Sequence, residues 1–177
     1  MPHIHTQPGQ HDLTVTAYII RTDTPEPQAL VHMHRKLRRL LPVGGHVELH
    51  ETPWQSVAHE IKEESGYVFT DLRVLQPQIR LMNTRYVVQH PYALSMNTHE
   101  VPESHFHTDI QYGFTAKAAP TTSVQEGESS DLRWMTQTEM NALGSDLIFM
   151  STVDVYNFMF DQVLTEWEEV PVGEFTL

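Results

Sequence analysis

Cysteine is missing from the chain, which excludes disulfide bonds, thiolate metal sites and cysteine nucleophiles. Long apolar runs are missing too, and the opening MPHIHTQPGQHD lacks the apolar core of a signal peptide. The lack of long apolar runs and of a signal peptide predicts a cytoplasmic protein that does not enter membranes.

Basic residues are scarce. The 177 residues include 11 Lys and Arg against 23 Asp and Glu, a formal net charge of −12. Such a surface repels nucleic acid polymers and anionic membranes. A small phosphorylated molecule can still bind where metal ions screen the carboxylates, so the expected partner is a small molecule.

The length predicts one domain, because the sequence shows neither an internal repeat nor a linker. We expect residues 1–12 to be a flexible arm and residues 13–177 to be the domain. Alternating β-branched residues at 13–21 predict a strand that pairs with a second strand at 28–34.

The second half of the chain mixes strand, loop and helix patterns. We expect strands within 68–81, broken near Pro77, and a strand pair at 85–96. A polar loop at 97–104 and a short strand at 131–135 should follow. Phe149, Val153, Tyr156, Phe160, Val163, Leu164 and Trp167 recur at helical spacing, which predicts a C-terminal packing helix.

A short helix after the Gly44-Gly45 pair carries the clearest chemical signal. Thr52, Pro53 and Gln55 form a capping-box start, and Gly66 suits the end of the helix. Its three glutamates, Glu60, Glu63 and Glu64, are spaced three and four apart and so lie on one stripe. Such a cluster requires either water or a divalent cation, and carboxylate oxygens suit Mg²⁺.

The spacing of these residues resembles the Nudix box. Its glycine, glutamate and aliphatic positions are matched by Gly45, Glu51, Glu60, Ile61, Glu63, Glu64 and Gly66. His59 stands where the family has arginine, and Tyr67 where it has an aliphatic residue. The resemblance implies an α/β fold, namely an α/β/α sandwich with a mixed β-sheet and a loop-helix-loop catalytic motif.

The resemblance also implies a pyrophosphatase: a metal-dependent hydrolase of a nucleoside diphosphate linked to another moiety, or of a similar organic pyrophosphate. Water would attack phosphorus, with Mg²⁺ or alternatively Mn²⁺ as the cofactor. Glu60 and Glu64 would be the principal metal ligands, with Glu63 as a third ligand or water partner and the Gly44 carbonyl as a backbone ligand. Glu60 is the first choice of general base, and Glu51 would orient the loop or reach the metal through water.

A later loop offers two further carboxylates. In the family, the loop before the Trp-bearing strand often completes the metal site, and here it contains Glu126 and Glu128. Either could be a metal ligand or the general base, or both could be solvated. Arg35 belongs to a basic run, 35–39, which is either an exposed hairpin tip or a contact for substrate phosphate.

The strand expected at 105–116 carries His105, His107 and Asp109 on its polar face and Phe106 and alternate residues on its buried face. The three polar residues could ligate zinc, but no fourth ligand is identifiable, and a strand facing a wet cleft shows the same pattern. By resemblance they would line the substrate pocket.

The change from arginine to histidine at position 59 leaves two hypotheses. A protonated His59 could orient the box carboxylates, in which case activity should fall as the pH rises above neutrality. Alternatively, the fold could serve as a catalytically weakened ligand sensor or regulatory binding protein. The complete glutamate set favours the enzyme. The substrate stays open among several pyrophosphates, and a homodimer is compatible with the family.

Overall fold

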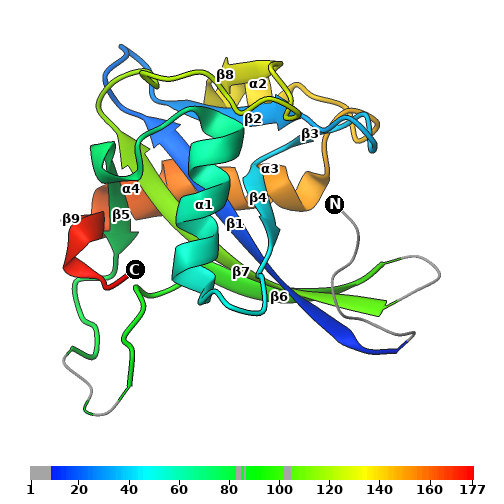
Figure 1. The fold of residues 1–177 in the computed structure, drawn as a ribbon. Helices are drawn as coiled ribbons and strands as arrows, with labels where there is room; N and C mark the ends of the chain where they lie inside the picture. Colours follow the sequence, from blue (N-terminus) through cyan, green and yellow to red (C-terminus); the bar gives the residue numbers. More distant parts are fainter. Residues whose placement is uncertain (1–8, 83–84, 86, 102–104) are drawn as a thin grey trace.

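A computed structural model describes residues 9–82, 85, 87–101 and 105–177, so most of the expected arm lies outside the described residues. Within these residues the fold is a mixed nine-stranded sheet flanked by helices (Figure 1). The strands are β1 (His11–Arg21), β2 (Gln28–Met33), β3 (Leu40–Leu41), β4 (Val43–His46), β5 (Leu72–Gln76), β6 (Ser95–Val101), β7 (His105–Ala116), β8 (Leu132–Met135) and β9 (Glu168–Pro171). The helices are α1 (Pro53–Ser65), η1 (Phe69–Asp71), α2 (Gln137–Asn141), α3 (Met150–Phe158), η2 (Met159–Val163), α4 (Leu164–Glu166) and η3 (Val172–Glu174).

The molecule has three layers, as expected. Helix α1 crosses one face of the sheet and α3 lies behind the other face (Figure 1). The first core joins Trp54, Val57 and Ile61 of α1 to β1 and β7. The second core joins Val153 and Tyr156 of α3 to the opposite sheet face.

Strands β1 and β7 form the centre of the sheet and are parallel to each other. Near its start β1 also pairs with β4, and near its end with β2, both antiparallel. Strand β7 similarly pairs first with β6 and then with β5. The sheet therefore divides into a β4-β1-β7-β6 half and a half that contains β2 and β5.

Two expected boundaries were wrong. Strand β1 begins at His11, so residues 11 and 12 belong to the sheet rather than to an arm. The strand pair expected at 85–96 does not form over the described residues up to 94; instead β6 occupies Ser95–Val101, most of which was expected to be a loop. The sequence of β6, SMNTHEV, is largely exposed, so it lacks apolar alternation and is held by pairing with β7.

The C-terminal packing helix forms but changes its pitch. After α3 the chain continues as one π-helical segment, η2, before α4. A π-segment has more residues per turn than an α-helix. Met159 is fully buried instead of the expected Phe160, which is only partly buried. Among the described residues, none of the helices has both the length and the apolar character needed to span a membrane.

Candidate active site

Helix α1 begins and ends as the sequence predicts. The Thr52 hydroxyl accepts a hydrogen bond from the Gln55 amide at 3.3 Å, and the Gln55 side chain accepts one from the Thr52 amide at 2.8 Å. Gly66 ends the helix with φ = 72°, a left-handed conformation that glycine adopts without steric cost. These caps fix which side chains face the sheet and which face the glycine loop.

Two of the four box glutamates, Glu60 and Glu64, are buried. Burial, and then the charge of Glu63, raises the pKa of Glu60 to about 7. Burial raises the pKa of Glu64 to about 8, even though the Gly44 amide donates a hydrogen bond to its Oε2 at 3.0 Å. The site therefore disfavours two carboxylate charges unless a cation is added.

The glycine loop lies directly against these carboxylates. A Cβ atom at Gly45 would lie 2.1 Å from Glu60 Oε1, so only glycine leaves room for the carboxylate in this position. Gly44 contributes its amide to Glu64, while the role of its carbonyl as a ligand stays a prediction.

His59 links the two remaining box glutamates. Its Nε2 lies 2.9 Å from Glu63 Oε1, and its Nδ1 lies 3.3 Å from Glu51 Oε1. Burial opposes protonation, but the hydrogen bond with Glu63 and the neighbouring carboxylates raise the pKa of His59 above its usual value. Glu51 also accepts a hydrogen bond from the Ser56 hydroxyl at 3.1 Å.

His32, on β2, is a neighbour of the site that the sequence analysis missed. Its Nε2 lies 3.6 Å from Glu64 Oε2. Burial, followed by the charge of His34, lowers the pKa of His32 to about 4, so it is neutral at pH 7 and does not balance the charge of Glu64. A single imidazole in an otherwise apolar buried strand was the signal that could have identified it.

The polar loop at 117–130 docks onto the end of α1. The Thr122 amide and hydroxyl donate to the Gly66 carbonyl, and the Gln125 amide donates to the Glu63 carbonyl at 2.8 Å. Glu128 is partly buried. Burial is the main cause of the raised pKa of both Glu60 and Glu64, and the charge of Glu128 raises these two pKa values further. Glu126 is exposed. Of the two loop glutamates, the structure brings Glu128 to the site.

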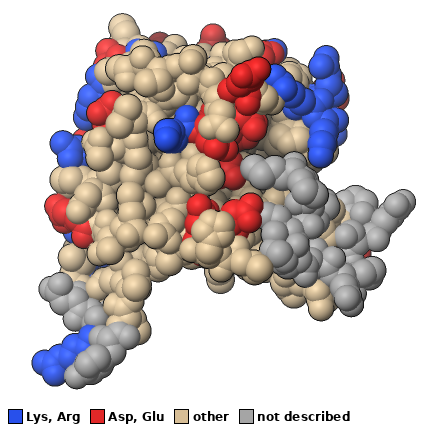
Figure 2. Space-filling model, viewed as in Figure 1, with Lys and Arg blue, Asp and Glu red and all other residues tan. Residues whose placement is uncertain are grey.

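Arg35 lies at the exposed turn between β2 and β3 and contacts the same loop. Its guanidinium donates to the carbonyls of Gly127 and Glu128. Figure 2 shows acidic side chains gathered over α1 and a group of Lys and Arg side chains over this turn. Arg35 therefore holds the loop that carries Glu128, and a contact with substrate phosphate stays a prediction.

The box residues fit a hard divalent cation. They present oxygen donors, as Mg²⁺ and Mn²⁺ require. Among the described residues, the buried Oε2 atom of Glu60 has no hydrogen-bond partner. A cation would stabilise the deprotonated forms of Glu60 and Glu64, which burial disfavours.

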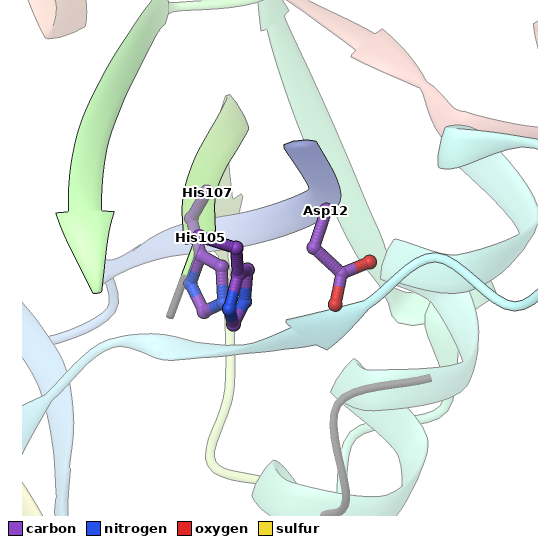
Figure 3. Close-up of side chains that lie close together, drawn as sticks. All are labelled: Asp12, His105 and His107. Carbon is purple, nitrogen blue, oxygen red and sulfur yellow. The ribbon is translucent and has the colours of Figure 1, made fainter. Parts of the chain in front are cut away.

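His105 and His107 do come together, but with Asp12 rather than with Asp109 (Figure 3). The ligand atoms of Asp12, His105 and His107 all lie within 4.8 Å of one another. Asp12 is the register partner of His107 in the parallel β1–β7 pair. Burial, and then the neighbouring His46, His99 and His105, lowers the pKa of His107 to about 4.

Asp109 has a different environment from the two histidines. Its carboxylate accepts hydrogen bonds from the hydroxyls of Thr14 and Thr16 at 3.0 Å and from the side-chain amide of Gln111 at 2.9 Å. Asp109 is thus buried among partners, whereas Phe106, expected on the buried face, is 36% exposed. At this end of β7 the polar face is the buried one.

One family model matches this sequence, and no curated protein does. The sequence model of the NUDIX domain matches residues 10–150.

Similar solved structures share the fold. A NUDIX-family hydrolase from Clostridium perfringens is 24% identical, with a TM-score of 0.69, over 85% of this chain and 96% of that chain. An Ap4A hydrolase from C. elegans is 14% identical, with a TM-score of 0.57, over 89% and 96%. The NUDIX domain of Shewanella oneidensis NrtR, in complex with ADP ribose, is 15% identical, with a TM-score of 0.55, over 87% and 88%.

Proposed function

The chain belongs to the NUDIX family, and from this premise we propose that it hydrolyses a nucleoside diphosphate linked to another moiety, or a similar organic pyrophosphate, with Mg²⁺ or Mn²⁺ as cofactor. The observation that carries the proposal is the pair of buried carboxylates, Glu60 and Glu64, packed against the Gly44-Gly45 loop. Burying two adjacent carboxylates opposes folding in the absence of a cation, so a binding role explains their position.

Each box residue has a proposed task. Glu60 and Glu64 would hold the cation, with Glu63 as a third ligand or water partner and the Gly44 carbonyl as a backbone ligand. When bound, the cation neutralises pyrophosphate charge and makes a water molecule more nucleophilic. The Gly44 amide orients the Glu64 carboxylate, and the absence of a side chain at Gly45 lets Glu60 reach its position.

The proton of the attacking water needs an acceptor. Glu60 is our first choice, because it lies among the proposed metal ligands and its buried Oε2 atom has no hydrogen-bond partner among the described residues. Glu128 is the second choice, since it is the loop glutamate that lies within electrostatic reach of Glu60 and Glu64.

His59 supports the enzyme rather than the sensor. It contacts Glu51 and Glu63 together, as an orienting arginine would. Each ring nitrogen makes one contact, whereas a guanidinium group can donate two parallel hydrogen bonds to a carboxylate. The replacement at position 59 therefore does not require that hydrolysis be lost.

The test is phosphate release, after coupled phosphatase treatment, from a panel of substrates with Mg²⁺ or Mn²⁺. The panel contains oxidised nucleotides, ADP-sugars, dinucleoside polyphosphates and coenzymes; Ap4A and ADP ribose are included because similar structures are named for them. Glu64→Gln should lower metal-dependent turnover by roughly 10²- to 10³-fold, since a bound metal supplies several kcal/mol. Glu128→Gln should lower it more than Glu126→Gln.

Glu166→Gln, an exposed site on α4, is the matched control and should retain wild-type turnover. Turnover that survives Glu64→Gln would contradict the proposal. No turnover of any compound by the wild type, together with tight binding of one in calorimetry, would identify a ligand sensor instead.

A further inference from the structure

Two histidines and one aspartate gather at the start of β1 and β7, away from the box glutamates. His105 and His107 are alternate residues of β7 and therefore project from the same face of the strand. Asp12 lies opposite His107 in the neighbouring parallel strand β1. Strand pairing alone places the three side chains together, so the cluster needs no loop to form.

The cluster lies on the opposite sheet face from α1. Asp12 alternates with Thr14, Thr16 and Tyr18 along β1, and the ring of Tyr18 packs against Tyr156 of α3 at 4.9 Å. Val15 and Ile19, on the other face of β1, belong to the core beneath α1. The box glutamates and the histidine cluster are therefore separated by the sheet.

The donor set favours a transition metal over Mg²⁺. Imidazole nitrogens suit Zn²⁺ and its neighbours, whereas oxygen-only sites suit Mg²⁺ and Mn²⁺. Neighbouring ligand atoms of a tetrahedral zinc site lie about 3.3 Å apart, given bonds of about 2.0 Å. Here the three ligand atoms lie within 4.8 Å of one another, so side-chain rotation would bring them to bonding positions.

We propose that Asp12, His105 and His107 form a Zn²⁺ site that fastens the start of β1 to the start of β7. Three protein ligands leave a fourth position for water or another donor. Because both strands belong to the centre of the sheet, the ion would stabilise the β4-β1-β7-β6 half.

His46 would orient the carboxylate ligand. Its Nε2 lies 3.3 Å from Asp12 Oδ2, and its ring is perpendicular to that of His107 at 5.0 Å. Groups that contact a ligating carboxylate in this way tune metal affinity without binding the ion.

The experiment titrates the full-length, chelator-treated protein with Zn²⁺ alone in a calorimeter. We expect a zinc-binding site that is lost in Asp12→Asn and in His107→Gln, and weakened about 10- to 100-fold in His46→Gln. His50→Gln, a histidine change at an exposed position, is the matched control and should leave zinc binding unchanged. Glu64→Gln should also retain the site, which separates it from the box.

Equal zinc affinity and stoichiometry in wild type, Asp12→Asn and His107→Gln would overturn the proposal, as would a wild type that binds no zinc. Circular dichroism and urea unfolding show whether each variant is folded. A second readout needs no variant: Co²⁺ bound to the wild type should give the strong visible absorption of a four-coordinate site with imidazole ligands. Only the weak absorption of octahedral, oxygen-bound Co²⁺ would contradict the assignment.

Discussion

The α1 carboxylates and the histidine cluster lie on opposite faces of one sheet and show two ways of assembling charged groups. The carboxylates come from one helix and its preceding loop, so local spacing brings them together. Asp12 and His107 come from strands distant in sequence, and only the parallel β1–β7 register makes them neighbours. The first region offers oxygen donors and the second mainly imidazole nitrogens, which predicts different ions for each.

The α1 carboxylates and the histidine cluster should differ most in how they make the free energy of unfolding depend on pH. The pKa of Glu64 is about 8 in the folded protein, so between about pH 4.5 and 8 the folded state holds a proton that the unfolded state has lost. The stabilisation that comes from the proton held by Glu64 is fully present below pH 4.5 and is lost as the pH rises through 8. Stability of the metal-free protein should thus fall across this window, on the order of a few kcal/mol when Glu60 is included.

The titration of His107 should give the opposite slope of stability against pH. Its pKa is lowered to about 4, so between about pH 6.5 and 4 the unfolded state binds a proton that the folded state does not, and stability falls as the pH falls. Urea unfolding from pH 4 to 8.5 measures both effects. Glu64→Gln should reduce the loss above pH 6.5, to which Glu60 also contributes, and His107→Gln should reduce the loss below it, to which His32 also contributes. Saturating Mg²⁺ should restore stability only at the alkaline end. The same curve for all three proteins would refute the assignment of both groups.

A substitution in the glycine loop should have a smaller effect, which changes Mg²⁺ affinity but not stability. Gly45→Ala places a methyl group where Glu60 Oε1 lies, and the carboxylate, as the end of a flexible side chain, must turn away. We expect Mg²⁺ affinity to fall by roughly 10- to 100-fold, as for other residues that position ligands, with little change in unfolding midpoint. Gly173→Ala is the control, because a Cβ there meets nothing within 4 Å. Calorimetry with Mg²⁺ on both variants decides; equal affinities would show that Glu60 is not a ligand.

The smallest effect belongs to His59, whose side chain is 48% exposed. Contacts at such sites contribute less than about 1 kcal/mol, so His59→Gln should lower the rate by about fivefold at most. The protonated form exists below its raised pKa, so its contribution is lost as the pH rises through that value. His59→Arg should keep the rate and remove this part of the alkaline decline. An unchanged pH–rate profile in His59→Arg would exclude an orienting role for the imidazolium.

The sequence predicted local features well. The capping box at Thr52, the glycine that ends α1 and the stripe of glutamates all depend on neighbours within one or two turns. The family resemblance rests on the same short stretch, and the NUDIX domain match and the observed three-layer fold confirm it.

Features that depend on pairing across the sheet were missed. Asp12 was assigned to a flexible arm because its single polar position gives no strand signal by itself, and β6 lacks apolar alternation because it is exposed. Phe106 was expected inside because it alternates with polar residues along the strand, but here the buried face carries His105 and Asp109. Met159 and Phe160 lie three and four residues after Tyr156, so helical spacing alone could not decide which of them is fully buried.

The docking of Thr122 and Gln125 on the end of α1 has a consequence for protein engineering. A graft that moved only the glycine loop and α1 into another scaffold would carry Glu51, Glu60 and Glu64 but not the loop that is bonded to Gly66 and Glu63. Glu128 would then be absent or misplaced. The smallest transferable unit of this site is therefore discontinuous: it consists of two chain segments joined by backbone hydrogen bonds, and a transplant must include both.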